Sequence, residues 1–356
     1  MSDWSGARNI LAVRLDAMGD VLMTTPALRA LKEGGGRRIT LLTSRSGAAM
    51  APLIPLIDEF IPYEPPWMKS APPLTGAGGE HEMIARLRDR RFDAAVIFTV
   101  YTQSPLPAAL LCHLAGIPLR LAHCRENPYQ LLTDWIPDPE PEKMLRHECR
   151  RQLDLVSARG FTTSDERMSL RVSPSARCRV ERLLAAHGFD TGGDWAVVHV
   201  GATAASRRYP VGQFGAVCEM LAAGHGWSLV FTGTRDEAPL AAAAMPAQRS
   251  LSLAGQLDLE STAALIGLAP LLISNNTGPV HIASALGTPV VDLYALTNPQ
   301  HTPWKTPHRV LSHDVPCKYC YKSVCPEGHG HCLRLIDPLE VVQAALELRA
   351  LRQMVA

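Results

Sequence analysis

The chain has 356 residues, 47% hydrophobic and 19% charged, which is long enough for two domains that each bury a core. Its 35 Lys and Arg residues balance 34 Asp and Glu residues, which excludes a global attraction to nucleic acid, so we expect no nucleic-acid partner. No apolar run approaches the roughly 20 residues of a membrane-spanning helix, and no signal-peptide core follows Met1. Nine scattered cysteines favour reduced thiols, so we expect a cytoplasmic protein.

Strand-like and helix-like segments alternate through the first half of the chain. We expect strands at residues 9–15, 38–43, 58–62, 92–99 and 118–122, and helices at residues 80–91, 105–115 and 145–159. The apolar segment that contains Pro26 is also helical, and we expect that helix to begin near Thr24 or Thr25. Residues 65–79 predict a surface loop and residues 123–143 an irregular segment. The alternation is typical of a doubly wound parallel sheet in an α/β protein.

A second α/β series follows a linker at residues 171–174. We expect its strands at residues 195–200, 227–232, 250–253, 270–273 and 289–293, and its helices at residues 175–187, 211–223, 257–268 and 280–286. A final helix is expected at residues 338–354. The two halves therefore predict two domains of similar architecture.

Four candidate turns lie where predicted strands end: residues 18–20, 201–207, 233–236 and 275–281. Ligands of open parallel sheets bind outside the carboxyl ends of the strands. In the last turn, Thr277 is a candidate helix cap, and the helix that follows presents its N-terminus to an anion such as phosphate. An ordinary strand–helix turn is the alternative. Neither a P-loop nor a G-x-G-x-x-G motif follows the first strand, which argues against ATPases and dinucleotide-binding enzymes.

Charged residues in two of these turns have both a chemical and a structural interpretation. Arg207 and Arg208 suit a diphosphate, because guanidinium groups pair with phosphate oxygens in bidentate fashion. They also fit a solvated basic pair. Asp20 follows Gly19 at the mouth of the first turn and is either a reactive carboxylate or a helix cap.

Several pieces of this sequence together resemble glycosyltransferase family 9, the heptosyltransferases that extend the inner core of lipopolysaccharide. The pieces are residues 13–22 with 25–28, residues 199–210, residues 233–236, and residues 275–281 with 285–289. The resemblance implies a GT-B fold, in which two Rossmann-like domains face each other across a cleft. We expect an acceptor-binding domain at residues 1–172 and a nucleotide-sugar-binding domain at residues 173–336. Residues 337–356 are expected to form a helix that packs back on the N-terminal domain.

The resemblance also implies an activity. The family transfers a heptose, or a related sugar, from an ADP-activated donor to a glycan acceptor such as the lipopolysaccharide inner core, with inversion and without a metal. No cofactor is therefore expected. The implied partners are the nucleotide sugar and a glycan or lipid-linked glycan acceptor. A peripheral contact with the cytoplasmic face of the inner membrane is left open.

Site residues carried over from the family fall in both halves. Asp20 takes the place of the general base. The donor residues are Thr203, Arg207, Asn276, Thr277, Gly278, His281 and Arg235. Arg207 stands where the family usually has Lys, Asn276 where its turn often opens with Asp, and Arg235 near where some members have Glu. On loops of the N-terminal half, the candidate acceptor residues are Arg45, Tyr101, Gln103 and Arg125.

Four cysteines gather near the end of the chain, with two histidines beside them. They are Cys317, Cys320, Cys325 and Cys332, together with His329 and His331. Four thiolates within sixteen residues suffice for a structural zinc site. Only the first pair has the Cys-x2-Cys spacing, so reduced thiols in a surface loop, or disulfides under oxidising conditions, stay open as alternatives.

Three alternatives to the heptosyltransferase remain. The first is a glycosyltransferase acting on a small-molecule or natural-product acceptor. The second is a nucleotide-sugar epimerase of the same GT-B shape, which would need more acid and base groups than the turns provide. The third is a non-catalytic scaffold whose cysteine-rich tail binds metal and partners.

Overall fold

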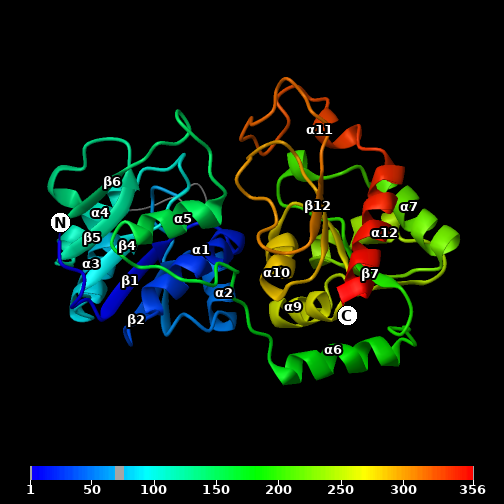
Figure 1. The fold of residues 1–356 in the computed structure, drawn as a ribbon, viewed down its shortest axis with the longest axis horizontal. Helices are drawn as coiled ribbons and strands as arrows, with labels where there is room; N and C mark the ends of the chain where they lie inside the picture. Colours follow the sequence, from blue (N-terminus) through cyan, green and yellow to red (C-terminus); the bar gives the residue numbers. More distant parts are fainter. Residues whose placement is uncertain (1, 69–75, 356) are drawn as a thin grey trace. The chain divides into compact units, whose positions relative to one another are not determined.

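The computed structural model describes residues 2–68 and 76–355, and it forms two compact units, residues 1–169 and 170–356 (Figure 1). The units divide after Ser169, three residues before the predicted boundary. Part of the predicted loop at residues 65–79 lies outside the described residues. No helix within the described ranges is long and apolar enough to cross a membrane.

The first unit contains a parallel six-stranded sheet in the order β3-β2-β1-β4-β5-β6. Its strands are β1 (Asn9–Arg14), β2 (Arg38–Thr43), β3 (Glu59–Pro62), β4 (Ala94–Ile97), β5 (Leu119–Cys124) and β6 (Asp134–Pro137). Its helices are α1 (Met18–Lys32), α2 (Arg45–Met50), α3 (Gly78–Asp89), α4 (Leu106–Leu114) and α5 (Glu148–Ser157). Helix α1 packs against α5, and α3 packs against α4. Leu87 of α3 and Ala109 of α4 share a buried cluster with Leu11 and Val13 of β1.

Two expectations for this unit were wrong. Helix α1 begins at Met18 and runs through Pro26 instead of starting near Thr24 or Thr25. A proline at this position cannot donate to the carbonyl of Leu22, and the hydroxyl of Thr25 donates to that carbonyl at 2.6 Å instead. The segment expected to be irregular contains β6, a short strand at the edge of the sheet that ends in a proline, as edge strands can.

The second unit repeats this topology, with the strand order β12-β11-β10-β7-β8-β9. Its strands are β7 (Trp195–His199), β8 (Ser228–Thr232), β9 (Ser250–Ser252), β10 (Leu272–Asn275), β11 (Val290–Leu293) and β12 (His308–Leu311). Its helices are α6 (Pro174–Ala186), α7 (Val211–Glu219), α8 (Ala238–Ala244), α9 (Leu259–Leu268), α10 (Gly278–Leu286), α11 (His331–Arg334) and α12 (Pro338–Val355). Both sheets have the strand order of a doubly wound α/β fold, which confirms the predicted fold class. Their order reverses between β1 and β4 and between β7 and β10, and ligands of such sheets bind at these switch points.

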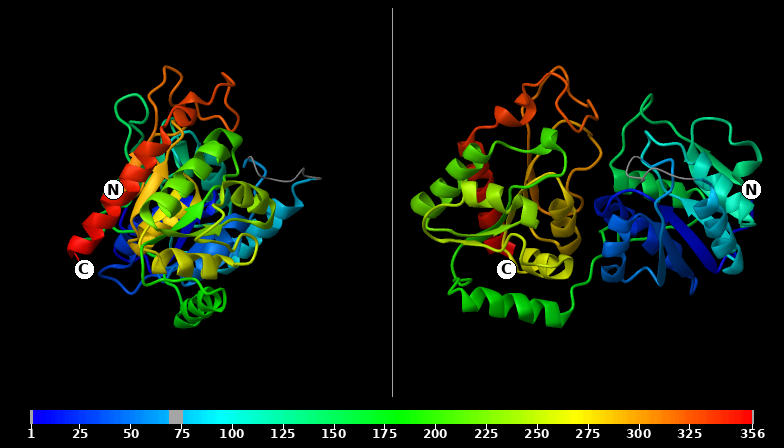
Figure 2. Two further views of the ribbon diagram at one scale, coloured as in Figure 1. Left: turned by 90° about the vertical axis from the view of Figure 1, so that its right-hand side faces the viewer. Right: turned by 180° about the vertical axis from the view of Figure 1, so that it is seen from behind.

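The final helix, α12, packs within the second unit, where it contacts α7, β11 and β12 (Figure 2). Val341, Ala345 and Leu348 lie on one face of α12 and are buried in the core of this unit. Glu347 pairs with Arg309 of β12 at 3.0 Å. The apolar face of the helix is therefore used by the sheet of its own unit, and the expected packing on the N-terminal domain stays a prediction.

Candidate active site

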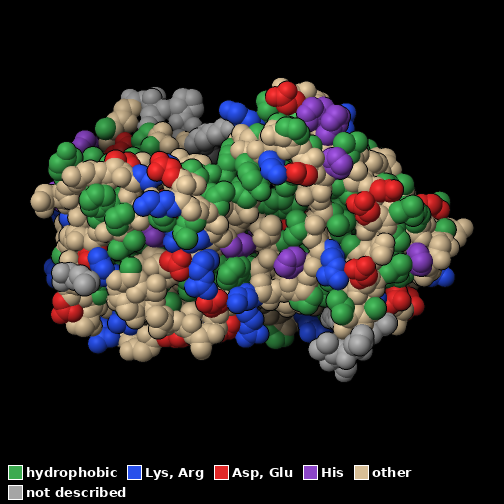
Figure 3. Space-filling model, turned by 45° about the horizontal axis from the view of Figure 1, so that its top comes forward, with side chains coloured by type: hydrophobic (Ala, Val, Ile, Leu, Met, Phe, Trp, Pro, Cys, Tyr) green, Lys and Arg blue, Asp and Glu red, His purple; other side chains and the backbone are tan. Residues whose placement is uncertain are grey.

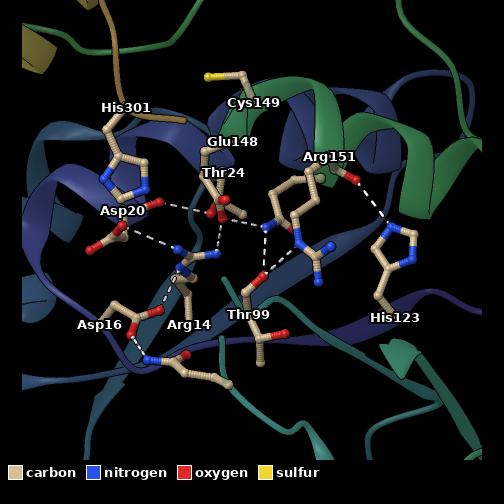
Figure 4. A network of polar contacts seen from close by, with 12 residues as sticks. Arg14, Asp16, Asp20, Thr24, Thr99, His123, Glu148, Cys149, Arg151 and His301 are labelled. Carbon is tan, nitrogen blue, oxygen red and sulfur yellow. Dashed lines mark hydrogen bonds and ion pairs between the residues drawn. The ribbon is translucent and has the colours of Figure 1, made fainter. Parts of the chain in front are cut away.

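In the first unit, one arginine is surrounded by three carboxylates at the carboxyl end of β1 (Figure 4). Arg14 is fully buried, and its Nε lies 3.0 Å from Asp16. Its two terminal nitrogens lie 3.2 Å from Asp20 and 2.7 Å from Glu148. Asp16 comes from the turn between β1 and α1, Asp20 lies in the first turn of α1, and Glu148 is the first residue of α5. The packing of α1 on α5 therefore assembles a carboxylate cluster that the local sequence does not reveal.

Asp20 both caps α1 and faces a cleft. Its Oδ2 accepts a hydrogen bond from the backbone N–H of Ala17 at 3.1 Å, and its Oδ1 accepts from Arg14. The side chain is 15% exposed and contributes to the wall of the cleft. Burial raises the pKa of Asp20, and the charge of Glu148 adds to this effect while Arg14 opposes it. The cap and the reactive carboxylate are thus compatible roles for one side chain.

Asp16 is held by one ion pair and one hydrogen bond. Besides Arg14, its Oδ1 accepts a hydrogen bond from the amide of Gln103 at 2.6 Å. Burial raises the pKa of Asp16 to about 6, although the Arg14 guanidinium pulls in the opposite direction. Gln103 follows β4, so the bond ties together the two strand ends at the switch point.

The cleft beside these carboxylates has a volume of about 1050 Å³. Of the four predicted acceptor residues, Arg45 and Gln103 line it. Tyr101 is buried and Arg125 is exposed, and neither lines the cleft. The lining residues that the sequence analysis did not identify include Ser44, Ser46, Glu64, Trp67, Thr102 and Ser104. Most follow the carboxyl ends of β2, β3 and β4, which is the positional signal that could have identified them.

In the second unit, the loop after β7 carries the predicted phosphate-binding arginine. Arg207 ends a short 3-10 helix and has no ion-pair partner among the described residues, whereas Arg208 donates to the carbonyl of Ala202 at 2.7 Å. Thr203 is exposed in the same loop. The hydroxyl of Ser206 donates to the carbonyl of Lys322 at 2.7 Å, which anchors the loop. Arg207 is half-buried and Arg208 is exposed, and of the two it is the guanidinium of Arg208 that is anchored to a backbone carbonyl, through Nε.

The turn after β10 places its predicted residues around the start of α10. Asn276 uses its amide nitrogen twice, donating to Asp292 and to the carbonyl of His301, each at 2.9 Å. Thr277 occupies the expected N-cap position of α10, but its side chain does not cap the helix. Its hydroxyl donates to the carbonyl of Asn275 instead of accepting a hydrogen bond from a backbone N–H of the helix. Gly278 begins the helix. The predicted His281 is buried one turn further on.

Two carboxylates of this unit were missed by the sequence analysis. Glu237 accepts hydrogen bonds from the backbone and hydroxyl of Thr234, at 2.9 and 3.1 Å, and lies so close to Gly201 that a Cβ there would be 2.0 Å from its Oε1. The Thr-x-x-Glu spacing of a capping box was the available signal. Asp292 is fully buried, and burial raises its pKa well above the ordinary value. Arg235, predicted as a donor residue, is exposed.

Zinc was only one of the alternatives for the cysteine-rich loop, and among the described residues its four thiols are not gathered into one metal-binding group. Cys317 Sγ lies 3.9 Å from Nε2 of His329, and the backbone N–H of Gly330 lies 3.4 Å from Sγ of Cys325. Throughout residues 2–68 and 76–355, no three His, Cys, Asp or Glu side chains are close enough to hold a metal ion. The loop supports its neighbours through its backbone, since the carbonyl of Lys322 accepts the hydrogen bond from the hydroxyl of Ser206. On the face shown in Figure 3, acidic and basic side chains are interspersed.

Comparisons with known proteins agree with the two-unit fold. The profile of "Glycosyltransferase family 9 (heptosyltransferase)" matches residues 81–331. Lipopolysaccharide heptosyltransferase 2 of Escherichia coli K12 is 24% identical over 96% of this chain and 98% of its own length. Lipooligosaccharide heptosyltransferase 2 of Campylobacter jejuni is 29% identical over 85 residues, so the match spans 23% of this chain and 27% of that protein.

A solved structure shows the same fold over nearly the whole chain. The E. coli ADP-heptose lps heptosyltransferase II superimposes with a TM-score of 0.74 at 21% identity, covering 97% of this chain and 99% of that one. This likeness indicates two Rossmann-like domains of the GT-B type. Because the family profile spans more than half of its residues, the chain belongs to glycosyltransferase family 9.

Proposed function

We propose that this protein transfers a heptose, or a related sugar, from an ADP-activated donor to a glycan acceptor such as the lipopolysaccharide inner core. The observation that carries the proposal is Asp20, an ionisable carboxylate in the first turn of α1 that faces a cleft of about 1050 Å³. Family membership and a relative named for ADP-heptose support the choice of donor.

In the proposed reaction, Asp20 acts as the general base. It takes the proton of an acceptor hydroxyl while that oxygen forms a bond to the anomeric carbon of the donor sugar. The bond from that carbon to the diphosphate breaks on the opposite face, and the anomeric configuration is inverted. The raised pKa of Asp20 suits this role, because a stronger base accepts a proton more readily at neutral pH.

We propose that the second unit stabilises the leaving diphosphate without a metal. Arg207 lacks an ion-pair partner in the described parts of the chain, so its guanidinium is available to phosphate oxygens. The N-terminus of α10, which begins at Gly278, adds a positive partial charge. Thr203 and His281 are the further proposed contacts to the nucleotide and diphosphate. No cofactor is required by this scheme.

The acceptor is proposed to bind in the cleft of the first unit. Hydroxyl, amide and guanidinium groups of Ser46, Gln103 and Arg45 line it and suit the hydroxyls of a sugar. Trp67 adds an aromatic wall, and aromatic rings combine apolar contact with a fixed geometry. We also propose that the protein is cytoplasmic and meets its lipid-linked glycan acceptor at the inner membrane.

A product assay tests this proposal. The protein is incubated with ADP-heptose, with and without a lipopolysaccharide core acceptor, and free ADP and the glycan mass are measured. We expect ADP release and a heptose added to the glycan only when the acceptor is present. Isomerised nucleotide sugar without ADP release would instead identify an epimerase. Sugar transfer only to small-molecule acceptors would show that the acceptor is a small molecule and not a glycan. Inactivity with a full panel of nucleotide-sugar donors would contradict the proposal.

A further inference from the structure

The carboxylate cluster contains more negative charge than its arginine can neutralise. Arg14 makes its three contacts with Asp16, Asp20 and Glu148, at 3.0, 3.2 and 2.7 Å. One guanidinium carries one positive charge, so the cluster has an excess of two negative charges when all three carboxylates are ionised. The shortest of the contacts goes to Glu148, the carboxylate furthest from Arg14 in the sequence.

The side chain of Glu148 is held in place by another residue of α5 and does not line the cleft. It is fully buried, and its Oε1 accepts a second hydrogen bond from the amide of Gln152 at 2.5 Å. That amide also donates to the carbonyl of Thr99 at 3.1 Å. Glu148 is absent from the residues that line the cleft. It therefore lies outside the cleft and acts on Asp20 in two ways, by binding Arg14 and by the repulsion of its own charge.

Arg14 and Glu148 act in opposite directions on the pKa of Asp20. A guanidinium that faced Asp20 alone would favour its ionised form strongly and make it a poor base. Here the charge of Arg14 is shared, and Glu148 adds a like charge nearby. Burial raises the pKa of Asp20 most, Arg14 lowers it, and Glu148 raises it again. The same carboxylate also raises the pKa of Asp16.

We propose that Glu148 is a positioning residue that, by occupying one side of Arg14, leaves Asp20 basic enough to take the acceptor proton. The inference rests on the proposed function, since it explains how a carboxylate beside an arginine remains a useful base. It deepens the assignment of Asp20 by adding a residue 128 positions later in the chain that does not line the cleft.

The test replaces Glu148 with Gln, which keeps the shape and removes the charge. We expect the acid limb of the kcat/KM profile to move about one pH unit lower, because Asp20 loses a like-charge neighbour and gains a larger share of Arg14. The plateau turnover should fall several-fold, because a base with a lower pKa accepts the proton less readily. Glu148→Asp keeps the charge and should hold the acid limb within a few tenths of a pH unit of the wild type.

The matched control is Glu140→Gln. Glu140 is equally buried and pairs with Arg146 and Arg151, at 3.1 and 2.5 Å, but it makes no contact with Arg14. We expect its substitution to leave the acid limb in place, whatever it does to the melting temperature. An equal displacement in Glu140→Gln and Glu148→Gln would show a general effect of lost buried charge and would overturn the inference.

A second measurement does not depend on activity. The carboxyl carbons of Asp16 and Asp20 are followed by ¹³C NMR against pH in the unliganded full-length chain, with assignments from Asp16→Asn and Asp20→Asn. We expect both titrations to move to lower pH in Glu148→Gln, and an unmoved Asp20 titration would overturn only this inference. Full turnover of Asp20→Asn would instead overturn the proposed base together with the role of Glu148.

Discussion

Asp20→Asn separates the two roles that the structure gives this side chain. An amide retains one oxygen, which can still accept from the N–H of Ala17 and cap α1. It cannot take a proton from an acceptor hydroxyl. We therefore expect the substitution to spare the fold and to remove the base.

The structure also gives the expected effect on stability. Burial raises the pKa of Asp20 in the folded protein, so its ionised form is disfavoured there relative to the unfolded chain. The associated stability is fully present below the unfolded pKa and is lost as pH rises through the folded pKa. At pH 8, replacing the carboxylate removes one of two excess negative charges beside Arg14, which offsets the weakened hydrogen bond. We expect little change in melting temperature at that pH.

The effect on catalysis should be much larger. Loss of a positioned general base lowers the rate by roughly a hundredfold or more, which corresponds to about 2.7 kcal/mol in the activation barrier. The assay combines turnover with donor titration by calorimetry and a thermal melt for wild type and variant. Near-wild-type turnover with a normal melt would refute the reasoning, and Asp16, four residues earlier and bound to the same arginine, would become the candidate base.

Three further predictions follow from the site. Arg207→Ala should weaken donor binding by about 1.5–3 kcal/mol, because a charge-assisted hydrogen bond to the diphosphate is lost. The control Arg208→Ala should change donor affinity little, because the guanidinium of Arg208 donates to the carbonyl of Ala202. Equal donor affinities of wild type and Arg207→Ala by calorimetry would show that Arg207 is not part of the site. Asp16 should contribute to the free energy of unfolding below pH 3.8, and this contribution should be lost as pH rises through about 6, the pKa of Asp16 in the folded protein. Between pH 4 and 8, the free energy of unfolding of Asp16→Asn, measured by chemical denaturation, should therefore rise by roughly 2–3 kcal/mol relative to wild type. A difference between the two proteins that does not depend on pH would contradict the raised pKa. Turnover should survive EDTA; activity that disappears on chelation and returns with Mg²⁺ or Mn²⁺ would overturn the metal-independent scheme.

Much of the secondary structure was predictable because its causes are local. The apolar runs that became β1, β2, β7 and β10 alternate with helical periodicity, and this pattern alone indicated parallel sheets. Parallel strands place their carboxyl ends on one edge, so the turns that hold Asp20, Arg207 and Gly278 could be selected without coordinates. The structure places Asp20 on a cleft and Arg207 without an ion-pair partner in the described residues.

Features decided by long-range packing could not be predicted in this way. The sequence around Asp20 does not indicate that Arg14 also meets Glu148, 134 residues away, because the contact exists only once α5 packs against α1. The same limit applies to the buried face of α12, whose apolar stripe indicates that it packs but not on which sheet. Helical periodicity indicates which face of a helix is buried. The element against which that face packs depends on the shapes and charges of distant segments. For this protein, local sequence determined the turns that carry the candidate residues, and tertiary packing decided the electrostatic environment of Asp20.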